Sequence, residues 1–105
     1  MRIASWNVNS LKARLARTEE WLDIARPDVL CLQETKLADD AFPHLTFGAM
    51  GYESVHFGEG RWNGVAILSR VGIADVVTGF GDLDDPYPGE ARCIAATCGG
   101  VRVID

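Results

Sequence analysis

The side chains best suited to chemistry stand where two short apolar runs end. Asn7 and Asn9 close an alternating run at residues 2–8, and Glu34 follows a nearly continuous apolar run at residues 29–33. An amphipathic segment separates the two runs, which is the pattern of a βαβ unit with parallel strands. Because the carboxyl ends of parallel strands meet at one edge of a sheet, we expect these polar groups to lie together there.

This group of residues has the character of a site for a hard divalent cation. Mg²⁺ prefers carboxylate and carbonyl oxygens, and it keeps water and substrate phosphate as its other ligands. Glu34, supported by the amide of Asn7, would supply part of such a shell. The competing interpretation is that these polar residues only begin the loops after the strands, and spacing alone favours that interpretation.

The elements that must position these residues are those of an α/β protein. Ser10 suits a helix N-cap. An apolar stripe at helical spacing begins at Leu11 and continues until Pro27 forces a stop. Further β-rich runs follow at residues 52–57, 64–69, 73–78, 92–97 and 101–104. Residues 81–89, rich in Asp and Pro, are expected to form a solvated loop.

Composition and charge narrow the function classes. The 105 residues are 48% hydrophobic and carry a net charge of −5, which argues against nucleic-acid binding by bulk electrostatics. The charge is uneven, however, since residues 1–36 carry six basic against five acidic side chains and residues 37–105 carry four against ten. The front of the chain could therefore face a phosphate backbone. Three cysteines without CxxC spacing and no long apolar segment predict a reduced, cytoplasmic protein without a membrane partner.

Two blocks of sequence resemble one nuclease family. Residues 6–14, WNVNSLKAR, and residues 27–36, PDVLCLQETK, match in order and separation the opening of the exonuclease III family of abasic-site endonucleases, within the endonuclease/exonuclease/phosphatase superfamily. Residues 64–69, GVAILS, and residues 89–92, GEAR, resemble two later segments of that family. The LQETK block is highly specific and looks like the DNA-repair branch.

The resemblance implies a four-layer α/β sandwich, with two mixed sheets face to face and helices outside. It also implies a nuclease dependent on Mg²⁺, for which Mn²⁺ can substitute, that cuts duplex DNA at abasic sites and 3' ends. Glu34 corresponds to the family's metal-binding glutamate, and Asn7 to an asparagine of the metal and phosphate site. The positions that the resemblance assigns to DNA or phosphate are Lys12, Arg14, Lys36, Arg61, Asn63 and Arg92.

Several of these residues have a second interpretation. Lys36 would either tune the carboxylate of Glu34 or meet phosphate. Arg92 would either approach phosphate or pair with a carboxylate of the acidic loop. Residues 61–63 would contact DNA, or they would form a solvent loop with a packed Trp62. The histidines, His44 and His56, lack ligand spacing and are expected to be structural.

The β-rich run at residues 101–104 reaches to within one residue of the end without a turn or cap. We therefore expect residues 1–105 to be the N-terminal portion of a single domain, monomeric when full length. The family's remaining catalytic groups would lie beyond Asp105, so no catalytic residue is assigned within the chain. The second sheet is also expected to be missing. Its absence would leave four inward side chains without cover: Val65, Ile67, Ile94 and Val103.

Two alternatives remain open at this point. A phosphatase of the same superfamily, acting on phosphoinositides or sphingomyelin, would share the fold and the metal site. A non-catalytic binding protein would fit a natural chain that stopped at Asp105, because such a chain could not assemble the family's whole active site.

Overall fold

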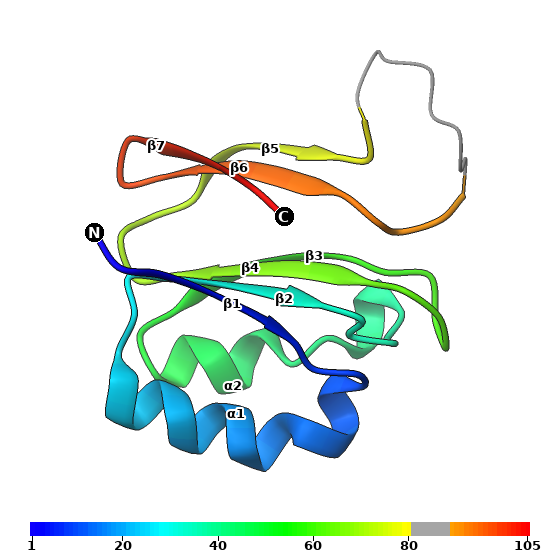
Figure 1. The fold of residues 1–105 in the computed structure, drawn as a ribbon, viewed down its shortest axis with the longest axis horizontal. Helices are drawn as coiled ribbons and strands as arrows, with labels where there is room; N and C mark the ends of the chain where they lie inside the picture. The colour runs from blue at the N-terminus through cyan, green and yellow to red at the C-terminus, as the bar shows by residue number, and fades with distance from the viewer. Residues whose placement is uncertain (81–88) are drawn as a thin grey trace.

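The computed structural model describes residues 1–80 and 89–105, which form two sheets with helices against the outer face of one (Figure 1). In sheet A the strand order is β1 (Ile3–Asn7), β2 (Val29–Gln33), β4 (Val65–Ser69) and β3 (Glu53–Phe57). In sheet B the order is β5 (Ala74–Thr78), β6 (Ile94–Cys98) and β7 (Val101–Ile104). The helical elements are α1 (Leu11–Ala25), the 3-10 turn η1 (Asp39–Ala41) and α2 (His44–Ala49).

The predicted βαβ unit is confirmed. β1 and β2 pair in parallel over their full length. The hydroxyl of Ser10 accepts a hydrogen bond from the Ala13 N–H at 3.3 Å and so caps the start of α1. The helix ends at Ala25, where Arg26 takes a left-handed conformation with φ 47° just before Pro27. This crossover brings the carboxyl ends of β1 and β2 to one edge of sheet A.

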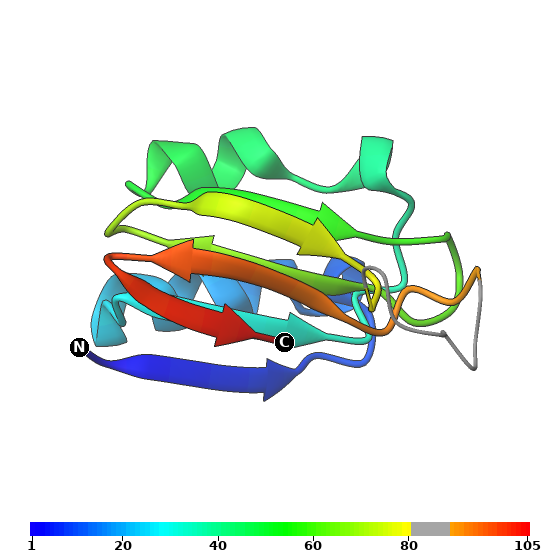
Figure 2. The ribbon, with the colours of Figure 1, turned by 90° about the horizontal axis from the view of Figure 1, so that it is seen from above.

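The second sheet is present, so our expectation that it is missing is wrong. Val65 and Ile67 of β4 pack against Ile94 of β6 and Val103 of β7 in one buried cluster. Figure 2 shows sheet B lying over sheet A. β6 pairs with β7 across the tight Gly99-Gly100 turn, and β5 pairs antiparallel with β6 on its other side.

The described residues build three of the four layers that the resemblance implied. A second apolar cluster, with Leu22 of α1 and Phe47 of α2, fills the space between the helices and sheet A. Sheet A is mixed, whereas the three strands of sheet B pair only antiparallel. Every residue of β5 is exposed, so no described helix covers the outer face of that strand. The predicted acidic loop at residues 81–89 lies almost wholly outside the described residues.

Within residues 1–80 and 89–105, neither helix has the length and apolar character needed to cross a bilayer. Cys31 and Cys98 are free, buried thiols. Burial between the sheets raises the pKa of Cys31 to about 12, which keeps that thiol protonated at ordinary pH.

Candidate metal and phosphate site

The segment after β2, residues 34–36, is held by backbone hydrogen bonds on both sides. On one side, the carbonyl of Glu34 accepts from the Ser10 N–H at 2.8 Å and the carbonyl of Thr35 accepts from the Leu11 N–H at 3.0 Å. On the other side, the Thr35 N–H donates to the carbonyl of Gly64 at 3.1 Å. The Lys36 N–H donates to the carbonyl of Asn63 at 2.8 Å. The ends of β1 and β2 and the entry to β4 are therefore joined at this segment.

Side chains alternate in direction along this segment. Glu34 and Lys36 have left-handed backbones, with φ of 54° and 55°, and their side chains are 45% and 28% exposed. Thr35 between them is completely buried. Left-handed φ is unfavourable for residues other than glycine, and it persists here because the surrounding bonds determine the backbone.

A polar cluster connects Glu34 with the end of β1. The Asn7 amide nitrogen donates to Glu34 Oε2, and the Asn9 N–H donates to Asn7 Oδ1 at 3.1 Å. Lys36 Nζ donates to Asn9 Oδ1 at 2.6 Å and lies 4.0 Å from Glu34 Oε1. The prediction that Asn7, Asn9 and Glu34 lie together is confirmed. The ammonium of Lys36 therefore lies beside the Glu34 carboxylate.

The donor set fits a hard cation held largely by water and phosphate. Glu34 offers a half-exposed carboxylate, and Mg²⁺ commonly takes only one or two protein carboxylates. Outside residues 81–88, no three His, Cys, Asp or Glu side chains group closely enough to hold a metal ion. Asn7 turns its amide nitrogen to Glu34 while its oxygen accepts from Asn9, so in this arrangement it orients the carboxylate. Direct ligation by Asn7 stays a prediction.

A pocket of about 210 Å³ opens beside Glu34. Its lining is Asn7, Gln33, Glu34, Asn63, Gly64, Val65, Ala91 and Arg92. Two residues predicted for phosphate, Asn63 and Arg92, thus share a wall with the predicted metal ligand. Gln33 was not predicted as a site residue. A polar side chain ending an otherwise apolar strand was the signal that would have found it.

The loop before β4 carries a projecting aromatic and cationic tip. The guanidinium of Arg61 lies 4.9 Å from the ring centroid of Trp62. Trp62 is 59% exposed. The alternative of a packed Trp62 is therefore wrong. Glu59 anchors the loop, since it accepts from the Ala91 N–H at 2.9 Å and from Asn63 Nδ2 at 2.8 Å. The bond from Ala91, followed by that from Asn63, lowers the pKa of Glu59.

The predicted basic residues divide into two groups. Arg92 lines the pocket. It also pairs with Glu90, with 2.5 Å between Arg92 Nε and Glu90 Oε2. The alternative role of Arg92 was an ion pair with the acidic loop, and this pair instead forms with the residue that follows the loop. Lys12 lines a separate, more apolar hollow with Leu15 and Pro43. Arg14 is exposed on α1. The structure therefore places Lys36, Asn63 and Arg92 around Glu34 and leaves Lys12, Arg14 and Arg61 on the surrounding surface.

Known proteins share this arrangement of sequence and fold. A model of the Endonuclease/Exonuclease/phosphatase family matches residues 4–104. Exodeoxyribonuclease III of Haemophilus influenzae is 40% identical over 70 residues, covering 67% of this chain and 26% of that protein. A 3' phosphatase from Neisseria bound to a product DNA hairpin is 48% identical with a TM-score of 0.90, and covers 99% of this chain and 40% of that one. An AP endonuclease from Archaeoglobus fulgidus is 39% identical with a TM-score of 0.92, covering 99% and 39%.

Proposed function

The chain belongs to the endonuclease/exonuclease/phosphatase family, and on that basis we propose that it is the N-terminal portion of a Mg²⁺-dependent DNA-repair nuclease. It spans between a quarter and two fifths of the length of the relatives compared above. The observation that carries the proposal is the position of Glu34, at the joined carboxyl ends of β1 and β2 and in one pocket with Asn63 and Arg92.

The chain's own residues divide the work of binding and orientation. Glu34 would hold the cation, and Asn7 keeps the Glu34 carboxylate in place through its amide. Arg92 in the pocket wall and Lys36, 4.0 Å from Glu34, would offer positive charge to a phosphate group of the substrate. When bound, Mg²⁺ would stabilise negative charge developing on phosphate and on the leaving oxygen. We assign no residue of this chain to the activation of water.

The proposed substrate is duplex DNA with an abasic site or a 3' end. Support comes from the names of the relatives, an exodeoxyribonuclease and an AP endonuclease, and from the DNA hairpin bound to the Neisseria protein. The exposed Arg61 and Trp62 pair suits DNA chemically, because a guanidinium can meet phosphate and an indole can stack on a base. We further propose a monomer in a reducing, cytoplasmic setting, consistent with the free thiols of Cys31 and Cys98.

The test uses the full-length protein that contains this chain. It is incubated with four substrates: a duplex carrying an abasic-site analogue, a duplex with a recessed 3' hydroxyl, a duplex with a 3' phosphate, and a soluble phosphoinositide. We expect Mg²⁺-dependent cleavage of one or more of the DNA substrates, lost in EDTA and restored by Mn²⁺. Release of phosphate from the lipid headgroup without any reaction on DNA would favour the phosphatase alternative. DNA cleavage that persists in EDTA would overturn the metal assignment.

A further inference from the structure

A chain of hydrogen bonds joins the segment at residues 34–36 to β3 at the edge of sheet A. The hydroxyl of Thr35 lies 2.7 Å from Nε2 of His56, and Nδ1 of His56 lies 2.8 Å from Oδ1 of Asp39. The same oxygen of Asp39 accepts from the Gly58 N–H at 2.8 Å. The His56 side chain has no exposed surface, and its ring stacks on Phe42 with 4.5 Å between the centroids.

The order of these groups resembles the hydroxyl, imidazole and carboxylate of a nucleophilic triad. Such a triad needs a hydroxyl that a substrate can reach. Thr35 has no exposed surface, so its hydroxyl cannot attack a substrate. The same geometry must then serve to hold Thr35 in place.

The protonation state of His56 decides which group donates and which accepts in each of these hydrogen bonds. Burial lowers the pKa of His56, and the nearby charge of Asp39 opposes that change only in part. The neutral ring donates from Nδ1 to Asp39, which leaves Nε2 as the acceptor for the Thr35 hydroxyl. Asp39 therefore fixes the tautomer that Thr35 requires.

Two glycines show how closely the loop at residues 58–64 fits against the site segment. A Cβ atom at Gly64 would lie 2.1 Å from the Thr35 hydroxyl, and one at Gly58 would lie 2.0 Å from the carbonyl of Leu37. Both ends of the loop therefore lie in close contact with residues 35–37, which directly follow Glu34. A shift of Thr35 would move the Glu34 backbone, whose left-handed φ leaves it little freedom.

We propose that His56, oriented by Asp39, is a positioning residue that holds Thr35 and thereby directs Glu34 toward the pocket. The inference rests on the proposed function, because it identifies what orients the proposed metal ligand. Partners that orient a metal ligand typically change metal affinity or activity by about 10 to 100-fold when they are removed.

The test compares variants of the full-length protein. Thr35→Val removes the hydroxyl at nearly constant volume, and Thr35→Ser keeps the hydroxyl but lacks the methyl group. Asp39→Asn weakens the orientation of His56 at a carboxylate that is 59% exposed. Ser54→Ala is the matched control, since Ser54 makes an equally short 2.7 Å bond to another histidine, His44, away from the site segment.

Mn²⁺ binding is measured by calorimetry, with hydrogen exchange at residues 34–37 and a thermal melt for each variant. We expect Thr35→Val to weaken Mn²⁺ binding about 10-fold and to speed exchange at the Lys36 amide. Asp39→Asn should show a smaller loss of about 3-fold, and Thr35→Ser and Ser54→Ala should stay within about 2-fold of the parent. If Thr35→Val fails to melt cooperatively, Asp39→Asn alone decides.

Two results would overturn the inference. One is unchanged Mn²⁺ affinity and exchange in both Thr35→Val and Asp39→Asn, and the other is an equal loss in Ser54→Ala. Glu34→Gln separates this inference from the proposed function. If Glu34→Gln loses Mn²⁺ binding while Thr35→Val keeps it, only the positioning role fails. If Glu34→Gln also binds Mn²⁺ like the parent, the proposed metal site itself fails.

Discussion

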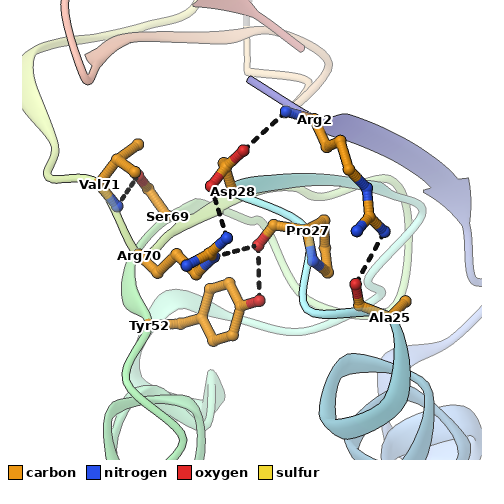
Figure 3. Close-up of polar contacts among 8 residues, drawn as sticks. All are labelled: Arg2, Ala25, Pro27, Asp28, Tyr52, Ser69, Arg70 and Val71. Atoms are coloured by element: carbon orange, nitrogen blue, oxygen red, sulfur yellow. Dashed lines mark hydrogen bonds and ion pairs between the residues drawn. The ribbon is translucent and has the colours of Figure 1, made fainter.

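The two ends of sheet A differ in how their polar groups are satisfied. At the amino end of β2, Asp28 pairs with Arg70 at 2.7 Å and accepts from the Arg2 N–H at 2.7 Å (Figure 3). The hydroxyl of Tyr52 donates to the carbonyl of Pro27 at 2.6 Å. The Arg2 hydrogen bond, supported by the Arg70 charge, holds the pKa of Asp28 below its ordinary value. The charged form of Asp28 is therefore the favoured one at this end.

The carboxyl end of β2 instead combines strained backbone with a buried carboxyl group that is only partly hydrogen-bonded. Five non-glycine residues in and around the site have positive φ: Asn9, Ser10, Glu34, Lys36 and Asn63. Asp105 lies against this end, where it accepts from Gln33 at 2.6 Å while its second carboxyl oxygen has no partner among the described residues. Burial raises the pKa of Asp105 to about 6. An end of a sheet whose polar groups are hydrogen-bonded can therefore support backbone strain and a buried carboxyl group at the other end.

The largest expected effect comes from making the same chemical change at both ends of β2. Glu34→Gln and Asp28→Asn each replace a carboxylate with an amide of similar volume. In the full-length protein, Glu34→Gln should lower Mg²⁺-dependent DNA cleavage by about 100-fold or more while the melting temperature holds. Asp28→Asn should lower the melting temperature at pH 7 while cleavage holds, because it loses the ion pair with Arg70.

Rates across a Mg²⁺ titration and thermal melts of both variants check this crossed pattern. The effect of Asp28→Asn on stability should fade as the pH falls, since the ordinary pKa of this carboxyl is 3.8 and its folded value lies lower. An unchanged cleavage rate for Glu34→Gln at every Mg²⁺ concentration would contradict the assignment of Glu34 as a metal ligand. Equal loss of stability in both variants would erase the difference between the two ends.

An intermediate effect is expected at Asp105. Because the folded pKa of about 6 lies above the ordinary 3.8, the folded protein holds this proton more tightly, and that stabilisation is lost as the pH rises through 6. Asp105→Asn has no proton to lose. It should exceed the parent in stability by about 1 to 2 kcal/mol at pH 8, a value reduced for partial exposure, and match it near pH 4. Urea unfolding of parent and variant at both values of pH measures the difference, and a variant less stable at pH 8 contradicts it.

The smallest effect is expected at the satisfied end. Tyr52→Phe removes the hydroxyl that donates to Pro27, while Arg70 Nε still donates to the same carbonyl at 3.2 Å. The variant should lose only about 1 kcal/mol of unfolding free energy, since the acceptor keeps a partner. Chemical denaturation gives this value, with Asp28→Asn as the companion variant. A loss of several kcal/mol would mean that this end depends on one bond instead of a shared network.

The first part of the fold could be predicted because its signals are local. The N-cap at Ser10, the stop at Pro27 and the two apolar runs lie within one βαβ unit, and each depends on its neighbours in sequence. The meeting of Asn7 with Glu34 follows from parallel pairing alone. The centre of the candidate site therefore follows from local sequence and parallel pairing.

The remaining features depend on contacts between distant residues. The packing of Ile94 against Val65 cannot be read from either strand alone, because any apolar strand pattern is compatible with either sheet. α2 has six residues, too few to show a helical period. The bond between Thr35 and His56 spans 21 positions, and no spacing rule connects a threonine in a loop with a histidine in an edge strand.

The anchored loop before β4 has a consequence for how the protein ages. Asn63 and Gly64 form the chain's only Asn-Gly pair, the dipeptide in which the glycine nitrogen most readily attacks the asparagine side chain to release ammonia. Here the Gly64 N–H is held by the carbonyl of Ala91 at 2.9 Å, and Asn63 Nδ2 is held by Glu59 at 2.8 Å. Deamidation would place a carboxylate in the wall of a pocket proposed to receive phosphate. The bonds that order the loop should therefore also slow a chemical change that would repel the proposed phosphate.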